Sequence, residues 1–290
     1  MPGTALVLSG GGAKGAFQVG AEKYLREERG FTWDIIAGVS VGSLNATMLA
    51  MEKYARLEEI WRNASNDQIY TGKLNVWALI KMVFGRKSAL GNEPLRKLIE
   101  SEWSPGLVTK DLRVGAVSLR TGRYEEFKAE RPDFASAVLA STAMPIYWKP
   151  VQMPPDYLDM VDGGLRNISP LGDVIKTDPD RIVIINCTPD DPDPQDEFPG
   201  ALQIGTRSLE IALNEILLND VREFVRINRL VEEAKVGGVT LHHEDGRAFK
   251  SFESVIIKPS GSLGDTLDFS TGAILRRLDA GREAARKAVP

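Results

Sequence analysis

The residue with the clearest chemical potential in this sequence is Ser40, which stands in a Gly-x-Ser-x-Gly motif. The motif, GVSVG, lies between an apolar run typical of a strand, 34–39, and a stretch typical of a helix, 41–53. A sharp strand-to-helix turn exposes a serine hydroxyl, and the positive end of the following helix favours a developing oxyanion. Gly38 and Gly42 carry no side chain that would collide across such a turn. The pattern therefore predicts that Ser40 is a nucleophile.

A glycine-rich loop, GGGAKG at 10–15, follows the first apolar run at 4–9. It matches the G-x-G-x-x-G dinucleotide fingerprint, but Asp34, about twenty residues further on, precedes the second strand instead of ending it. A phosphate loop would need Ser or Thr after Lys14, which is absent. A loop that merely turns the chain remains an alternative. With a serine nucleophile downstream, we interpret the loop amides as an oxyanion hole. The predicted set is Gly10, Gly11, Gly12, Ala13, Lys14 and Gly15, with the Val41 amide as a further donor.

Histidine is the usual base for a serine nucleophile, but the chain has only two histidines, His242 and His243. The order Ser40, Asp162, His242 is that of the α/β-hydrolases. In that fold, however, several strands precede the serine, whereas here at most one strand–helix unit does. The segment LHHEDGRAF is polar and contains an Asp-Gly turn, so we expect both histidines on a surface hairpin. The histidine triad stays an alternative.

The second candidate base is Asp162, which follows the apolar run YLDMV and precedes Gly163 and Gly164. An ordinary Asp-Gly turn is the plain alternative. An unperturbed aspartate, with a pKa of ~3.9, is a poor base for a hydroxyl. A pocket that raises the pKa and excludes water would make it competent. We therefore predict a Ser40–Asp162 pair, with the two glycines holding the aspartate at a tight turn.

The elements that must position these residues alternate between strand and helix. Further strand patterns occur at 112–119 and 181–187, and the first helix is expected at 16–29. Such alternation predicts an α/β fold with a mostly parallel sheet. The stretch 57–103 is rich in helix patterns and reads as an insertion or cap around the site. We expect one domain over 1–290, closed by an amphipathic helix at 272–288.

The three motifs GGGAKG, GVSVG and DGG, in this order, resemble the patatin-like phospholipases. The resemblance extends to WDIIAGVSVGSLNA, to ALASTAMPIYWKPV and to YLDMVDGGLRNISPL, and it covers the chain from residue 4 to about residue 187. It implies a three-layer α/β/α sandwich and a lipid acyl hydrolase of phospholipase or lysophospholipase type that needs no metal or organic cofactor. It also implies that Ser40 is the nucleophile, Asp162 the base and the Gly10–Gly12 amides the oxyanion hole. Lys14 stands where the family often has arginine, and Val39 replaces a frequent threonine.

The composition of the chain limits the classes of partner and cofactor that it can have. The net charge of −4 argues against a dedicated nucleic-acid binder, and the single cysteine, Cys187, excludes an intramolecular disulfide framework and a cysteine-based zinc site. No apolar run reaches the ~18–20 residues of a membrane span, and the N-terminus lacks a signal-peptide pattern. We therefore expect a cytoplasmic protein whose partner is its lipid substrate. The apolar stretch 75–84, NVWALIKMVF, is either a buried cap helix or an interfacial element for transient contact with a membrane surface.

Other functions remain open at this stage. A transacylase or a thioesterase would use the same dyad. A nucleotide-binding oxidoreductase would use only the glycine loop and leave GVSVG and DGG without a role. A lipid-binding module without catalysis would not react with a fluorophosphonate probe, and this reaction distinguishes it from the enzymes.

Overall fold

The computed structural model of the chain describes residues 3–290 apart from 66–68, 70–90, 191–193, 195–196 and 198–199. The strands are β1 Thr4–Leu8, β2 Ile35–Val39, β3 Asp111–Ser118, β4 Tyr124–Lys128, β5 Val151–Met153, β6 Tyr157–Asp162, β7 Arg181–Ile185 and β8 Glu253–Ile257. Within the described residues they form one sheet in the order β5-β6-β3-β2-β1-β7-β8, with β4 paired to β3. Strands β3, β2, β1, β7 and β8 are parallel, and β4, β5 and β6 are antiparallel to their neighbours. The predicted mostly parallel sheet is confirmed.

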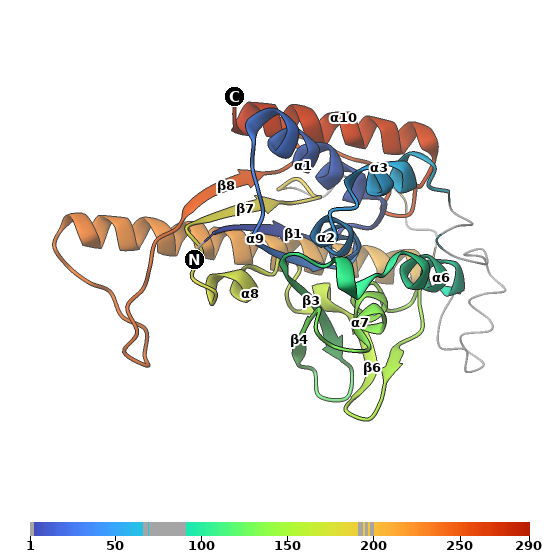
Figure 1. Ribbon diagram of the computed structural model, residues 1–290. Coiled ribbons are helices and arrows are strands. Elements are labelled where there is room, and N and C mark those ends of the chain that lie inside the picture. Colours follow the sequence, from blue (N-terminus) through green and yellow to red (C-terminus); the bar gives the residue numbers. More distant parts are fainter. Residues whose placement is uncertain (1–2, 66–68, 70–90, 191–193, 195–196, 198–199) are drawn as a thin grey trace.

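Helices cover both faces of this sheet (Figure 1). They are α1 Ala16–Arg29, α2 Val41–Ala50, α3 Tyr54–Arg62, α6 Glu93–Glu102, α7 Phe134–Ser141, α8 Leu171–Ile175, α9 Ala201–Val236 and α10 Thr271–Ala288, with short 3₁₀ turns η1 Gly12–Gly15, η2 Pro105–Leu107 and η3 Gly163–Leu165. Side chains of β1 alternate between the faces, because successive residues of a strand point to opposite sides. Leu6 and Leu8 join the core beneath α1, α2 and α10, whereas Ala5 and Val7 pack toward α8 and α9. The fold is therefore an α/β sandwich of three layers.

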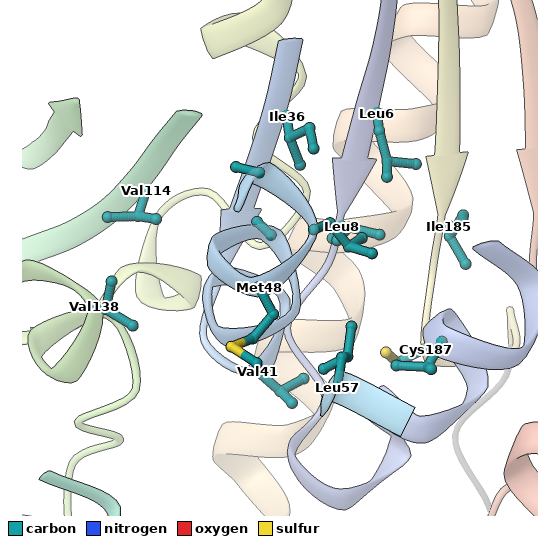
Figure 2. Close-up of a cluster of buried hydrophobic side chains, with 14 of the residues drawn as sticks. Leu6, Leu8, Ile36, Val41, Met48, Leu57, Val114, Val138, Ile185 and Cys187 are labelled. Atoms are coloured by element: carbon teal, nitrogen blue, oxygen red, sulfur yellow. The ribbon is translucent and has the colours of Figure 1, made fainter. Parts of the chain in front are cut away.

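Figure 2 shows part of the larger core, where neighbouring strands face the helices around the glycine loop. Leu8 and Ile185 of adjacent strands lie near Val41 of α2 and Leu57 of α3, and Cys187 closes the group (Figure 2). All of these residues are buried. Consequently the loop after β1 and the start of α2 pack against the buried core.

The parallel register brings the reactive segments to one edge of the sheet. Leu8 at the end of β1 lies opposite Gly38 of β2 and Ile185 of β7. The residues that follow these strands, including the glycine loop and Ser40, therefore leave the same edge. The antiparallel strand β6 delivers Asp162 to this edge, with Ala116 of β3 as its register partner.

The predicted elements compare well with the observed ones over the first half of the chain. Helix α1 has the predicted bounds, but α2 ends at Ala50 instead of residue 53, and Glu52 beyond it has a positive φ of 55°. Of the stretch 57–103, the structure describes α3 and α6, whereas the apolar stretch 75–84 lies outside the described residues. The long helix α9 and strand β8 were not predicted. None of the helices among the described residues has both the length and the apolar character needed to cross a bilayer.

Candidate active site

Ser40 sits at the tip of a strained turn between β2 and α2. Its backbone has φ 55° and ψ −128°, a region that a residue with a side chain occupies only when its surroundings enforce it. The Ser40 N–H donates to the Ser141 hydroxyl at 3.0 Å, and its carbonyl accepts from the Ser43 N–H at 2.9 Å. These contacts fix both sides of the turn. The geometry is that of a nucleophile elbow, as the motif predicts.

The two glycines of the motif allow the turn to press against its neighbours. A Cβ on Gly42 would lie 2.2 Å from the Leu8 carbonyl oxygen, and one on Gly38 would lie 2.2 Å from the carbonyl oxygen of Gly42. Both contacts are with backbone, which cannot move aside as a flexible side chain would. The spacing of glycines around Ser40 is thus a requirement of packing.

Asp162 is the last residue of β6 and is only 3% exposed. Its Oδ1 accepts a hydrogen bond of 2.8 Å from the Gly164 N–H, and its own N–H donates to the Ala143 carbonyl. Burial raises the pKa of Asp162 to about 6, although hydrogen bonding from Ser40 and from the Gly164 N–H opposes that rise. The carboxyl is therefore held in place and made more basic than a solvated aspartate.

Ser40 and Asp162 are neighbours, and one oxygen of the Asp162 carboxyl has no hydrogen-bond partner among the described residues. Ser40 is close enough to favour the Asp162 carboxylate and lower its pKa. Yet Oδ2 of Asp162 is buried and has no hydrogen bond of ordinary geometry to any described residue. Catalytic hydrogen bonds are often long in unliganded sites and shorten when substrate binds. We therefore regard Oδ2 as an open acceptor position beside the serine.

Three amides of the glycine loop already have backbone partners. The Gly10 N–H donates to the Ile168 carbonyl at 3.0 Å, and the Lys14 N–H donates to the Gly11 carbonyl at 3.1 Å. The Ala13 N–H donates to the Thr266 carbonyl at 2.8 Å. Because each N–H is already used, these three amides are not available to bind an oxyanion in this conformation.

Among the other loop amides, those of Gly11 and Gly12 donate to no further backbone group in the described part of the chain. The loop adjoins the nucleophile, since a Cβ on Gly10 would lie 3.2 Å from the Ser40 Cβ. The Val41 N–H, in the first turn of α2, is one of the amides that a helix start leaves without an internal partner. Within the predicted oxyanion set, these observations favour the amides of Gly11, Gly12 and Val41. Gly15 instead packs against the Val41 side chain.

A buried polar network ties the loop to the elbow helix, and sequence reasoning missed it. Asn45 of α2 donates to the Gly15 carbonyl at 3.0 Å and to the Gln18 side chain at 2.8 Å, and it accepts from the Trp61 indole at 2.9 Å. Gln18 donates in turn to the Ser9 carbonyl at 2.8 Å. The signal available in the sequence was a pair of polar residues within otherwise apolar helix faces.

An apolar cavity of about 110 Å³ opens beside Ser40. Gly12 and Ser40 lie at its lining together with residues of α2, α3, α6 and the loop before β5. Most of the lining is aliphatic or aromatic, namely Val41, Leu44, Met48, Leu57, Ile60, Trp61, Ala64, Ile69, Leu95, Leu98, Ile99, Trp103, Val138, Trp148 and Phe269. The cavity is suited to a hydrocarbon chain, because it would transfer the chain from water to apolar contacts.

Both histidines lie away from this cavity. His242 forms an isolated bridge with Ala248, and both histidine side chains are exposed. Their hairpin extends beyond the C-terminal end of α9, on the opposite side of the molecule from α6 and α7 (Figure 1). The surface hairpin predicted from the sequence is confirmed, and the structure gives the histidine triad no support.

Comparisons with known proteins find relatives of this chain. The family model described as patatin-like phospholipase matches residues 6–175. The chain is 31% identical over 186 residues to a cGAMP-activated phospholipase of Escherichia coli (strain TW11681), covering 55% of this chain and 51% of that protein. It is 29% identical over 191 residues to patatin-like phospholipase domain-containing protein 7 of Rattus norvegicus, covering 62% of this chain and 13% of that protein. This chain thus spans about half the length, or less, of these relatives.

A solved structure has the same fold. VipD from Legionella pneumophila superposes with a TM-score of 0.50, at 14% sequence identity, over 99% of this chain and 66% of that protein. At this identity the likeness concerns the fold alone.

Proposed function

The chain belongs to the patatin-like phospholipase family, and from this premise we propose that it is a serine-dependent lipid acyl hydrolase. The observation that carries the proposal is the pairing of Ser40, on a strained elbow, with the buried Asp162, whose pKa is raised to about 6. An apolar cavity opens at the same serine. A nucleophile, a base and an acyl-binding space therefore occur together.

The proposed reaction proceeds in two halves. The Ser40 Oγ attacks the carbonyl carbon of the ester while Asp162 accepts the hydroxyl proton. The N–H groups of Gly11 and Gly12, with that of Val41, stabilise the oxyanion. As the tetrahedral intermediate collapses, Asp162 gives the proton to the leaving alcohol and an acyl-Ser40 ester remains. Water, deprotonated by Asp162, then releases the fatty acid and restores the Ser40 hydroxyl.

The substrate class follows from the cavity. Its lining is mainly hydrocarbon, so we assign the acyl chain to it and the alcohol, a phospholipid head or a related group, to the solvent side. The cap role of 57–103 is supported by Trp61, Leu95 and Ile99, which line the cavity. We propose a single catalytic domain over 1–290. Contact of 75–84 with a membrane surface stays a prediction, to be tested by vesicle binding of Trp77→Ala with Phe84→Ser.

The proposal is tested by hydrolysis of phospholipids and short-chain esters. Asp162→Asn keeps the shape of the side chain but removes the proton acceptor, so we expect a loss of ~10²–10⁴-fold in kcat. Ser40→Ala should lose at least as much, and the double variant should be little worse because the two residues act as a unit. The assay is repeated with an added acceptor alcohol, to detect transfer of the acyl group, and with a thioester as substrate. These two assays distinguish a hydrolase from a transacylase and from a thioesterase.

Two bacterial relatives are named as activated by cGAMP, and this chain covers only about half of each. Assays are therefore run with and without this nucleotide. Unimpaired hydrolysis by folded Ser40→Ala would overturn the proposal in either condition.

A further inference from the structure

Arg277 of α10 is a buried cation that binds two separate segments of the backbone. Only 2% of the residue is exposed. Its Nε donates to the Leu263 carbonyl at 2.8 Å, and its Nη2 donates to the Asp265 carbonyl at 2.8 Å. Its Nη1 donates to the Asp268 carbonyl at 2.6 Å and to the Ala13 carbonyl of the glycine loop at 3.3 Å. Because a buried charge is costly unless its donors are satisfied, these carbonyls and the guanidinium hold one another in place.

The segment 263–268, between β8 and α10, lies between this guanidinium and the glycine loop. The Thr266 carbonyl accepts the Ala13 N–H at 2.8 Å. Gly12, whose φ is 56°, faces the same residue, since a Cβ on Gly12 would lie 2.5 Å from the Thr266 carbonyl oxygen. The segment therefore occupies the Ala13 amide and supports the backbone of Gly12, whose own amide is assigned to the oxyanion.

Arg277 joins the two ends of this segment to each other and to the glycine loop. Inside the segment the hydrogen bonds are short-range, such as that from the Leu267 N–H to the Asp265 carboxylate at 2.7 Å and that from the Asp268 N–H to the Asp265 carbonyl at 3.2 Å. Bonds of this kind shape a turn but do not fix its distance from the glycine loop. The guanidinium can fix that distance, because its donors form one rigid planar group.

The side chain of Arg277 acts from outside the cavity. In the described part of the chain, the cavity lining includes Gly12 and Ser40 but not Arg277. An effect of Arg277 on the reaction must therefore pass through the backbone that it binds. Stabilisation of an oxyanion depends on donors that already point in the right direction before the reaction begins.

We propose that Arg277 is a positioning residue for the oxyanion hole, which holds the Gly12 amide in direction through segment 263–268 and Ala13. The inference rests on the proposed function and names a residue of α10 on which its oxyanion stabilisation depends. Without the guanidinium, the Thr266 carbonyl is free to move away from Ala13, and the Gly12 amide loses its fixed direction.

The test measures kcat/KM of Arg277→Ala on p-nitrophenyl acetate and on p-nitrophenyl decanoate, per folded molecule. Both values should fall by ~10²-fold, the cost of misplacing a group of the site by about 1 Å. The two losses should be similar, because the acetate has no chain to fill the apolar cavity. The pH midpoint of kcat/KM should stay as in the wild type, since the bonds of Arg277 do not involve Asp162.

Two control variants separate this role from a loss of charge and from a loss of stability. Arg276→Ala removes the same type of side chain from the neighbouring, exposed position of α10. Phe224→Ala removes a buried ring from α9, in the core on the opposite face of the sheet, and lowers the melting temperature without touching the segment. Both should keep the wild-type kcat/KM per folded molecule. If Arg277→Ala does not fold, Arg277→Lys replaces it, because lysine keeps the charge and lacks the planar group.

Wild-type kcat/KM in the folded Arg277 variant overturns this inference and leaves the hydrolase intact. A loss confined to the decanoate contradicts it as well, because the damage would then lie in the acyl cavity. A shifted pH midpoint would place the damage at Asp162 and also contradict it. Failure of the wild type to hydrolyse either ester overturns the proposed function itself.

Discussion

At Asp162, burial and hydrogen bonding act on the carboxyl in opposite directions. Burial dominates and raises the pKa to about 6, whereas Ser40 and the Gly164 N–H favour the charged form. A carboxyl with this pKa is mostly ionised at neutral pH and is still basic enough for the proposed role of accepting the Ser40 proton. The sequence singled out both Ser40 and Asp162, because each stands in a short motif that can be recognised locally.

The pH dependence of activity tests this balance. In the proposed mechanism catalysis needs the Asp162 carboxylate, so kcat/KM should rise with pH through about 6 and level off above it. A stopped assay on a neutral short-chain ester, between pH 4.5 and 8.5, measures this rise in kcat/KM without interference from a titrating substrate. A rise in kcat/KM with a midpoint near pH 4, the pKa of a solvated aspartate, would show that burial does not act on this carboxyl as described.

Asp162 should also cost stability. Its folded pKa of about 6 exceeds the ordinary 3.8, so the folded state holds the proton more tightly than the unfolded state. The free energy of unfolding gained from this tighter proton binding is fully present below pH 3.8 and is lost as the pH rises through about 6. Asp162→Asn should therefore stabilise the protein at pH 7.5 by up to about 3 kcal/mol, with a gain that vanishes near pH 4. Denaturant unfolding at both pH values measures it, and an equal effect at both would contradict the account.

The oxyanion loop shows where residue-level prediction stopped. The sequence singled out six loop residues, but which amides are free depends on the Ile168 and Thr266 carbonyls, which are far away in the chain. No local pattern contains that information. The elbow strain at Ser40, by contrast, was implied by the glycines on either side of it.

At the scale of elements, α1 and α10 pack closely, because glycines let the two helices touch through their backbones. A Cβ on Gly20 of α1 would lie 1.9 Å from the Leu278 carbonyl oxygen, and one on Gly281 of α10 would lie 1.9 Å from that of Phe17. Helix α10 thus fixes α1, and α1 begins directly after the glycine loop. The predicted closing helix therefore also supports the site.

Substitution at this contact should be destabilising. In a free helix Gly→Ala is favourable by about 1 kcal/mol, but Gly20→Ala or Gly281→Ala must separate the backbones, and we expect a loss of about 1–3 kcal/mol. Gly205→Ala on α9 is the control, since a Cβ there meets nothing within 4 Å. Urea unfolding compares the three variants. Equal stability of Gly20→Ala and Gly205→Ala would show that the helices do not meet as described.

Helix α9 was missed although its sequence carries a signal. Over its 36 residues the buried positions Leu213, Leu217, Phe224 and Val231 recur at spacings that share one helix face. The resemblance to the family had thinned at about residue 187, and no motif drew attention to the segment. Its place across the sheet, opposite α1 and α10, could not be inferred from periodicity alone (Figure 1).

In the molecule as a whole, the residues proposed for catalysis lie at the carboxyl ends of the parallel strands, and the hairpin with the histidines lies beyond the far end of α9. Strand alternation predicted the sheet, and the family resemblance predicted the layers. The segments at 66–68 and 70–90 lie outside the described residues.

The position of the histidines supplies a test at this scale. Both are exposed on the hairpin between α9 and β8, so His242→Ala with His243→Ala should keep the hydrolysis rate within a few-fold of the wild type. Thermal melts confirm that the variant is folded. A folded but inactive double variant would favour a histidine triad and contradict the proposed Ser40–Asp162 dyad.

The central claim, that Ser40 is a nucleophile activated by Asp162, is tested most directly by mass spectrometry after reaction with a fluorophosphonate probe. The account predicts one adduct on the peptide that contains Ser40, none on Ser40→Ala, and labelling of Asp162→Asn slowed by ~10²-fold or more because the proton acceptor is gone. Folded wild-type protein that stays unlabelled, or an adduct on a different residue, would contradict it.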